Sequence, residues 1–366
     1  MEDEYQIIDN RNTISFKKGT FSGYKKNDVF KALFKSIESK KIENSLNWLV
    51  ECIISGYVTE VWDKLLLYII NVININNPNI VNILYKKNIL FNNICNRYDL
   101  NKNKEEILLL RNNSEIRNIF SSLLVILLDS DKNKRYDEYP KLKDEDFSMD
   151  SVLKRINSKF NLLPNNFVHF NEPSELKLIL NELYYNIKNT DNNGYENSIY
   201  WIIWIIKWEK MNRKNLKNWN IDERNKDVKK KYRSDVIWMI WDIIFLELEN
   251  KDNLIKKQVK SLYELYISNY SLNKKIKRLP YIYCSILYLT QHIDFSIKIL
   301  NNLDLYLRIQ LNINNLFKNK KIYEKNDIVK IKDNKKNKKV KNNNQKQIVK
   351  EKCLDKLSVF NDIDNI

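Results

Sequence analysis

Glycine and proline are scarce in this chain, with four glycines and five prolines among 366 residues. A sheet-rich fold needs many tight turns, and tight turns depend on these two residues. Hydrophobic residues make up 43% of the chain, which is enough to bury real cores. A chain of this length usually forms roughly two or three core-forming units. The sequence therefore predicts an all-α protein.

Apolar residues spaced three and four apart predict helices along most of the chain. The expected helices include the ranges 43–54, 114–130, 173–187, 196–211, 234–249, 252–270 and 280–291. Gly56 comes directly after the last apolar positions of the 43–54 helix, where a left-handed residue commonly ends a helix. We therefore expect Gly56 to adopt a positive φ and to terminate that helix.

Breaks in the apolar pattern indicate two helical lobes built of α-hairpins. The segment 129–150 is charged, contains Pro140 and has no sustained period, so it marks the expected boundary. Beyond Asn312 the apolar period fades, and the following lysine-rich stretch has too little hydrophobicity to offset the entropy of ordering. The expected parts are an N-terminal arm (1–27), a first lobe (28–130), a linker (131–150), a second lobe (151–317), a disordered basic tail (318–352) and a short docking helix (353–366).

The positive charge is concentrated in two segments. Residues 318–352 carry 14 lysines against four acidic residues, and residues 207–233 carry 11 basic residues against four acidic ones. The two excesses, +10 and +7, account for the whole formal net charge of +17. An AT-rich coding genome enriches lysine everywhere, so this localisation favours a functional origin of the charge. Flexible lysine runs bind polyanions.

Aromatic residues interleave with the basic residues of the internal segment, which offers phosphate neutralisation beside stacking surfaces. The alternative is a solvated helix face whose aromatic side chains turn into the core. The candidate nucleic-acid-binding residues are Arg213, Lys214, Lys217, Trp219, Arg224, Lys229, Lys230, Lys231 and Arg233, with Lys335, Lys336, Lys338 and Lys339 in the tail.

The residues needed for common catalytic and metal sites are missing or poorly spaced. No phosphate-binding glycine loop is present, and the four cysteines form no C-x-x-C pair. His169 and His292 each fit a polar position at a packed helix end or loop, and Asp222-Glu223 lacks a histidine at metal-binding spacing in sequence. We therefore expect a non-enzymatic protein with no cofactor and no metal.

The sequence favours a soluble intracellular protein, in a reducing compartment or in a virion. Cys52 and Cys284 lie in apolar helical runs, where a free cysteine behaves as a small hydrophobe. The N-terminus is acidic and lacks the apolar core of a signal peptide. The most hydrophobic stretches, 199–206 and 236–248, fall below the roughly 20 residues needed to span a bilayer. No membrane partner is expected.

Residues 31–78 combine a basic residue and a serine before isoleucine with two tryptophans, a glycine-containing break, a leucine pair and a proline. The matching positions are Lys35, Ser36, Ile37, Trp48, Gly56, Trp62, Leu65, Leu66 and Pro78. This range resembles the helical collar that follows the ATPase module in the family of the bacterial maintenance-of-genome-stability protein A, a relative of clamp loaders. Residues 72–77 stand where that family has an acidic turn, and the family's ATPase motifs have no counterpart here.

The resemblance implies homo-oligomerisation or docking of partner proteins in DNA replication or repair, and it carries over no catalytic residue. The combination of AT-rich bias and such a collar is similar to proteins of large DNA viruses of protists. The sequence thus favours a non-enzymatic accessory or scaffold protein for DNA replication or repair that binds nucleic acid through its basic segments. The alternative is a virion or other structural or interaction protein whose tail neutralises nucleic acid.

Overall fold

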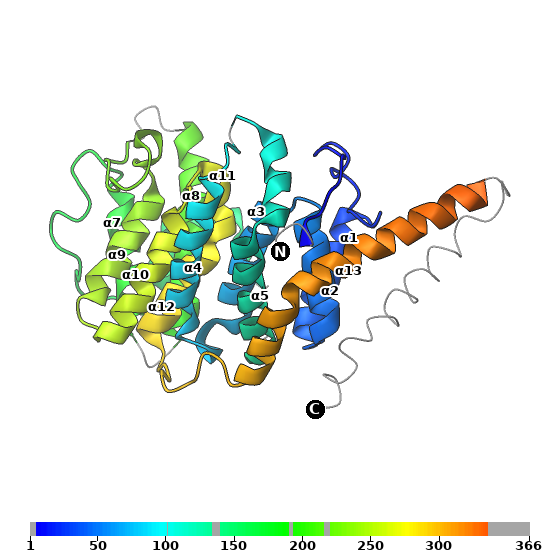
Figure 1. Cartoon of the computed structure of the whole chain (residues 1–366). Helices are drawn as coiled ribbons and strands as arrows, with labels where there is room; N and C mark the ends of the chain where they lie inside the picture. Colours follow the sequence, from blue (N-terminus) through cyan, green and yellow to red (C-terminus); the bar gives the residue numbers. More distant parts are fainter. Residues whose placement is uncertain (1–4, 101, 134–139, 190–192, 216–219, 336–366) are drawn as a thin grey trace. The chain divides into compact units, whose positions relative to one another are not determined.

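The fold consists of helices joined by loops (Figure 1). The structure is a computed structural model, which describes residues 5–100, 102–133, 140–189, 193–215 and 220–335. Within these ranges the one bridge between extended segments pairs Gly19 with Lys25, so the predicted all-α class is confirmed. No helix in the described part of the chain combines the length and the apolar character that crossing a membrane requires.

The chain forms two compact units that are interleaved along the sequence. Unit 1 comprises residues 1–66, 87–132 and 299–366, and unit 2 comprises residues 67–86 and 133–298. The predicted linker begins close to the division after residue 132. The structure differs from the predicted lobes in two places, because 67–86 belong to unit 2 and 299–317 belong to unit 1.

Unit 1 contains the helices of the N-terminal third, α5 and the C-terminal helix. Their bounds are α1 (Lys26–Glu38), α2 (Ile42–Ile54), α3 (Val58–Tyr68), the 3₁₀ helix η4 (Lys104–Asn112), α5 (Ser114–Asp129) and α13 (Leu303–Lys335). Helix α4 (Ile80–Cys95) begins in unit 2 and ends in unit 1.

Unit 2 contains five longer helices, α7, α8, α9, α10 and α12, and several short helical elements. These are η2 (Ile69–Ile73), η3 (Asn74–Asn76), η5 (Asp144–Phe147), α6 (Met149–Arg155), α7 (Glu175–Lys188), α8 (Gly194–Asn215), η6 (Lys230–Tyr232), α9 (Val236–Leu248), α10 (Asn253–Ile267), α11 (Leu272–Lys275), η7 (Ile276–Arg278) and α12 (Leu279–Thr290). Two of these, η5 and the start of α6, fall within the predicted linker.

Gly56 ends helix α2, as the sequence predicts. Its φ is +77°, and its N–H donates to Ile53 O at 3.0 Å. The next residue, Tyr57, donates to Cys52 O at 3.0 Å. These two bonds satisfy carbonyls that the end of a helix otherwise leaves unpaired, and they define a Schellman cap.

The core of unit 1 is centred on Trp62. The Trp62 ring stacks on Phe91, with ring centroids 4.6 Å apart, and meets Phe120 edge to face at 5.3 Å. Its indole N–H donates to Asn88 Oδ1, so the buried polar atom is satisfied. Trp48 of the preceding helix is only half-buried and packs edge to face on Tyr24.

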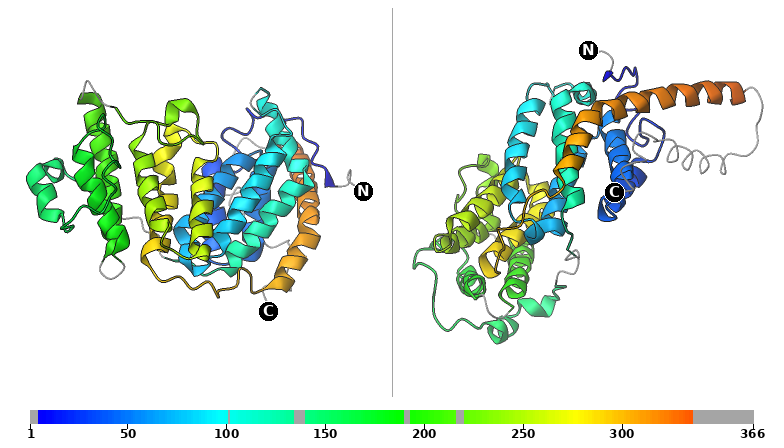
Figure 2. Two further views of the ribbon diagram at one scale, coloured as in Figure 1. Left: turned by 90° about the vertical axis from the view of Figure 1, so that its left-hand side faces the viewer. Right: turned by 60° about the horizontal axis from the view of Figure 1, so that its bottom comes forward.

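Helix α13 corrects the expectation of a disordered tail that begins at residue 318. The helix runs to Lys335, and its apolar face continues through Ile309, Ile313 and Phe317, all buried against unit 1. It packs on α5 and α2, and its C-terminal half projects beyond these helices (Figure 2). The remainder of the predicted tail (336–352) and the predicted docking helix (353–366) lie outside the described residues.

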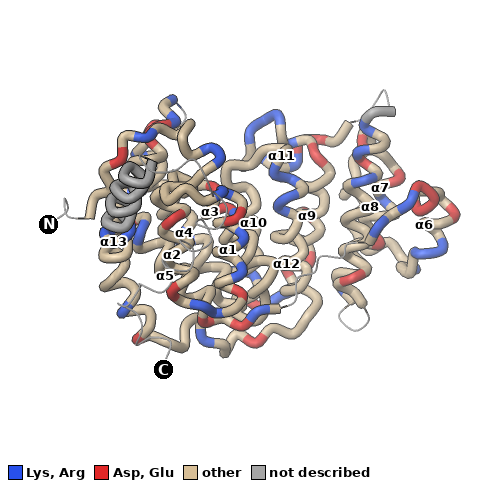
Figure 3. The backbone as a smooth tube through the Cα atoms, turned by 90° about the vertical axis from the view of Figure 1, so that its right-hand side faces the viewer, with Lys and Arg blue, Asp and Glu red and all other residues tan. Residues whose placement is uncertain are grey.

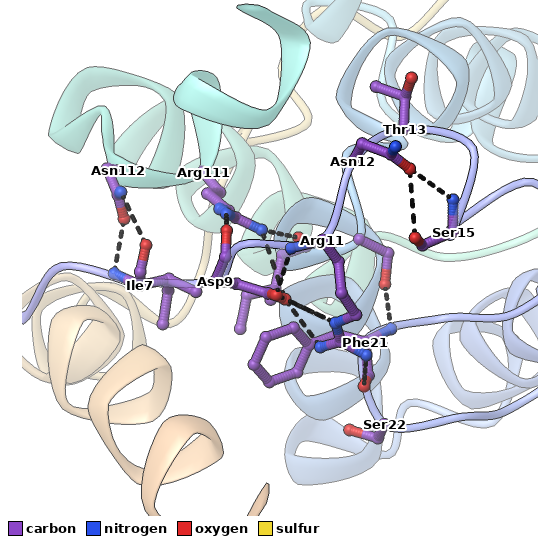
Figure 4. A network of polar contacts seen from close by, with 12 residues as sticks. Ile7, Asp9, Arg11, Asn12, Thr13, Ser15, Phe21, Ser22, Arg111 and Asn112 are labelled. Carbon is purple, nitrogen blue, oxygen red and sulfur yellow. Dashed lines mark hydrogen bonds and ion pairs between the residues drawn. The ribbon is translucent and has the colours of Figure 1, made fainter. Parts of the chain in front are cut away.

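The N-terminal arm wraps onto η4 of the same unit (Figure 4). Ile7 donates its N–H to Asn112 Oδ1 at 2.7 Å and accepts from Asn112 Nδ2 at 3.1 Å. Arg111 donates to Asp9 O at 3.1 Å, and Arg11 donates to Phe21 O at 3.0 Å. Paired backbone groups therefore hold the arm in place without a sheet.

The core of unit 2 is rich in aromatic rings. Helix α7 packs on α8 and α9, and α10 packs on α12. Tyr266 of α10 meets both Trp238 and Trp241 of α9, with ring centroids 5.9 Å and 5.4 Å apart. All three side chains are almost completely buried, and Trp238 Nε1 donates to Tyr232 O in the loop that leads into α9.

Candidate nucleic-acid interface

The internal basic segment spans the last turns of α8 and the loop that leads to α9. We name residues 220–235 the basic loop; it contains η6. Among the candidates, Lys217, Trp219, Lys336, Lys338 and Lys339 lie outside the described residues. For Lys214 and Lys335 the structure gives the helical backbone only.

Arg224 anchors the basic loop to the interior of unit 2. Its Nε donates to Glu172 Oε1 at 3.1 Å, and its Nη2 bonds Glu172 Oε2. Its Nη1 lies 3.1 Å from Asp242 Oδ2 on α9. The Arg224 side chain is only 8% exposed and that of Glu172 is fully buried. The sequence predicts that Arg224 contacts nucleic acid, but in the structure its guanidinium is hydrogen-bonded to the internal partners Glu172 and Asp242.

Arg233 closes the other end of the basic loop. Its Nε donates to Val228 O at 3.1 Å and its Nη2 to Lys226 O at 3.2 Å. Its Nη1 lies 3.3 Å from Glu223 Oε2. A backbone bond from Arg224 N to Arg233 O, 3.3 Å long, joins the two ends. Arg233 thus bonds other residues of the basic loop, and together with Arg224 it stabilises the conformation of the loop.

The lysines of the basic loop point to solvent. Lys226, Lys229, Lys230 and Lys231 are all exposed. Lys231 Nζ lies over the Tyr232 ring, 4.9 Å from its centroid. None of the four forms an ion pair with a residue in the described ranges. They are four ammonium groups on six residues of anchored chain.

The acidic residues within the basic loop have partners of their own. Asp227 accepts a hydrogen bond from the Tyr263 hydroxyl at 3.0 Å, and Glu223 pairs with Arg233. Asp222 Oδ2 lies 2.6 Å from His169 Nδ1. Arg233 thus offsets the charge of Glu223, and the six basic residues against four acidic ones in 220–235 leave the basic loop positive.

A buried charge cluster joins the basic loop to α11. Lys275 Nζ lies 2.6 Å from Asp235 Oδ1 and also bonds Glu209 Oε2 of α8. Burial raises the pKa of Glu209, and the nearby Asp235 raises it further, against the lowering effect of Lys275. The Tyr232 ring packs edge to face on Tyr270 at 5.7 Å.

These contacts bring the short α11 and η7 elements beside the basic loop. Exposed Lys277 of η7 adds to the positive surface there, and Lys and Arg positions gather at α11 in Figure 3. Arg213, at the end of α8, is 45% exposed and lies 3.8 Å from Glu209 Oε1. Of the three arginines predicted to bind nucleic acid, Arg213 has the most exposed side chain.

The structure brings His169 to Asp222, although the two have no metal-binding spacing in the sequence. Side-chain ligand atoms of His169, Glu172 and Asp222 lie within 4.8 Å of one another, a grouping that could hold a metal ion. Residues 169 and 222 are far apart in sequence, so no spacing motif predicts their contact.

The partners of Glu172 argue against a metal in this arrangement. Its Oε1 accepts from Asp222 N at 3.1 Å as well as from Arg224, and its Oε2 accepts from His169 N at 2.9 Å as well as from Arg224. Two donors on each oxygen use its lone pairs, and the Arg224 guanidinium supplies the positive charge that a metal would supply. The group fastens the loop containing His169 to the basic loop.

Comparison of the chain with protein-family models, with curated proteins and with solved structures finds no match.

Proposed function

We propose that the protein is a non-enzymatic accessory or scaffold protein for DNA transactions, which binds nucleic acid through the basic loop. The observation that carries the proposal is that the arginines of this loop bind its interior partners while its lysines are exposed. Arg224 and Arg233 are bonded inward, while Lys226, Lys229, Lys230 and Lys231 are exposed. A loop held in one shape loses little entropy on binding, so its lysines can neutralise phosphates at low cost.

Lysine suits contact with the phosphate backbone rather than with particular bases. Its ammonium is a compact point charge on a flexible stem, so it tolerates many phosphate positions. Phosphate contacts position a protein on nucleic acid and carry no sequence information. We therefore propose binding that is independent of sequence and sensitive to salt.

The scaffold role rests on the resemblance of residues 31–78 to a clamp-loader-type collar. Helices α1 and α2 pack together as a hairpin, and Gly56 forms the expected break before α3. Affinity purification from the native source tests this role. Recovery of clamp or polymerase subunits supports the replication or repair scaffold, whereas recovery of capsid or core proteins supports the structural alternative.

Removal of three loop lysines tests the nucleic-acid role. The variant carries Lys229→Gln, Lys230→Gln and Lys231→Gln, and fluorescence anisotropy with a labelled oligonucleotide measures its affinity. The matched control carries Lys17→Gln, Lys18→Gln and Lys25→Gln, which removes the same charge from exposed lysines of the N-terminal arm. We expect the loop variant to bind more weakly than the control; equal affinities would refute an interface at the basic loop.

A further inference from the structure

Phe170 is the most exposed large apolar side chain in the described part of the chain. Its relative exposure is 102%, compared with 80% for Leu311, the next in order, and 78% for Phe160, the next phenylalanine. The ring makes no aromatic or cation–π contact with another described residue. Leaving a phenylalanine in water forgoes the stabilisation of roughly 1.5–3 kcal/mol that burial of its side chain provides.

The backbone around Phe170 is firmly held although its side chain is free. Two residues later, the buried Glu172 accepts hydrogen bonds from His169 N, Asp222 N and Arg224. Phe167 O accepts from Arg224 Nη2 at 2.7 Å. His169 Nδ1 meets Asp222 Oδ2 on the other side. The ring is therefore presented to solvent by a fixed turn.

This turn is bonded to the start of the basic loop. Arg224 bonds Phe167 and Glu172 of the turn through its side chain and Arg233 through its backbone. Lys231 is two residues before Arg233, and a chain extends about 3.3–3.6 Å per residue. The exposed Phe170 ring and the exposed lysines are thus carried by two segments of unit 2 that Arg224 joins.

We propose that Phe170 is a stacking platform for an unpaired base of single-stranded nucleic acid, whose phosphates contact the lysines of the basic loop. The proposal rests on the proposed function and adds the class of nucleic acid. Charge complementarity selects this occupant, because the lysines favour a polyanion and a bare ring favours a flat apolar surface. Bases in a duplex already stack on one another, so a duplex would use the lysines and leave the ring unused.

Binding of the full chain to a single-stranded and to a double-stranded oligonucleotide tests the proposal. The variant is Phe170→Ala, the conservative variant is Phe170→Trp, and the matched control is Phe160→Ala, which removes the other highly exposed phenylalanine. We expect Phe170→Ala to weaken single-strand binding about 5- to 150-fold, as loss of one base stack does. Duplex binding, the salt slope and the Tm should not change, since the ring carries no charge and packs on nothing. The Phe170→Trp and Phe160→Ala variants should bind like the wild type.

Photocrosslinking separates stacking on Phe170 from binding by the lysine-rich C-terminal residues. A single-stranded oligonucleotide carrying 5-iododeoxyuridine should crosslink to the peptide that contains Phe170, and Phe170→Ala should remove that crosslink. If the wild type binds single strands but Phe170→Ala changes neither affinity nor crosslink, the stacking proposal is wrong while the proposed function stands. Equal losses for single strands and duplex also contradict it. If the wild type binds no nucleic acid at low salt, both proposals fall.

Discussion

Lys320 Nζ of α13 lies 2.9 Å from Glu51 Oε2 of α2, and the Glu51 side chain is completely buried. The same carboxylate accepts hydrogen bonds from the N–H and the hydroxyl of Ser22 in the N-terminal arm, at 2.7 Å and 2.8 Å. Glu51 is therefore the point where the arm, α2 and the C-terminal helix of unit 1 meet. A buried charge at such a junction makes the docking of α13 specific to one register.

Removing Lys320 should destabilise unit 1 strongly. Lys320→Met keeps the apolar stem but leaves the Glu51 carboxylate buried without its countercharge, a loss of about 3–5 kcal/mol in the free energy of unfolding. Urea denaturation at pH 7 measures this difference. Lys17→Met, at an exposed lysine of the arm, should stay within about 0.5 kcal/mol of the wild type. A Lys320→Met protein as stable as that control would mean that α13 does not dock here.

The cost of Lys320→Met should depend on pH in a defined direction. Burial raises the pKa of Glu51, but Lys320 and hydrogen bonds from Thr20 and Ser22 lower it more, so the net pKa lies below the ordinary 4.5. A lowered carboxylate pKa contributes stability that is present above pH about 4.5 and is lost as the pH falls through the folded-state pKa. The stability difference between wild type and Lys320→Met should therefore shrink on acidification below pH 4.5. A gap that widens on acidification would contradict the ion pair.

Three glycine-to-alanine substitutions separate backbone strain from steric clash. Gly23 has a φ of +82° with nothing within 4 Å of an added Cβ, so Gly23→Ala should cost about 1 kcal/mol from strain alone. Gly56 adds a contact of 2.5 Å between that Cβ and Leu108 Cδ2, so Gly56→Ala should cost about 2–4 kcal/mol. Gly19→Ala, with Tyr24 O as the nearest atom at 3.8 Å, should be neutral. Thermal denaturation of the three variants gives the order, and a neutral Gly56→Ala would contradict the assigned cap.

The buried Lys275 should matter more to unit 2 than any exposed lysine. Lys275→Met leaves the buried Asp235 without its countercharge and Glu209 with only Arg213, 3.8 Å away, which should cost about 3–5 kcal/mol at pH 7. Lys277→Met, at an exposed lysine two residues along the chain, is the control. Burial and Asp235 already raise the pKa of Glu209, and a raised carboxylate pKa means that stability increases as the pH falls. Urea denaturation at pH 5 should therefore show partial recovery of Lys275→Met, and no recovery would argue against this cluster.

Local features of the fold could be predicted because they depend on neighbouring residues. The expected helix at 114–130 is α5 (Ser114–Asp129), and the expected helix at 280–291 is α12 (Leu279–Thr290). Gly56 could be assigned from its place after α2, since only glycine enters a positive φ there without steric cost. Composition alone sufficed for the all-α class.

The features that could not be predicted from the sequence depend on partners that are distant in sequence. Ile313 and Phe317 continue the four-residue spacing of α13, and past residue 317 the helix is held by the pairing of Lys320 with Glu51, a partner far away in the sequence. The roles of Arg224 and His169 likewise depend on Glu172 and Asp222, about 50 residues away in each pairing. A basic composition could not separate the inward arginines from the outward lysines.

The salt dependence of binding tests most directly whether the anchored basic loop contacts phosphate in a chain without the lysines beyond Lys335. The measurement uses a chain that ends at Lys335, which keeps Lys320 docked on Glu51, with and without the Lys229→Gln, Lys230→Gln and Lys231→Gln substitutions. We predict that the shortened chain still binds single-stranded DNA at low salt. The triple substitution should reduce the slope of log K against log salt by roughly 2–3, at about 0.7–0.9 per lost phosphate contact. No binding by the shortened chain, or identical slopes for the two proteins, would contradict the account.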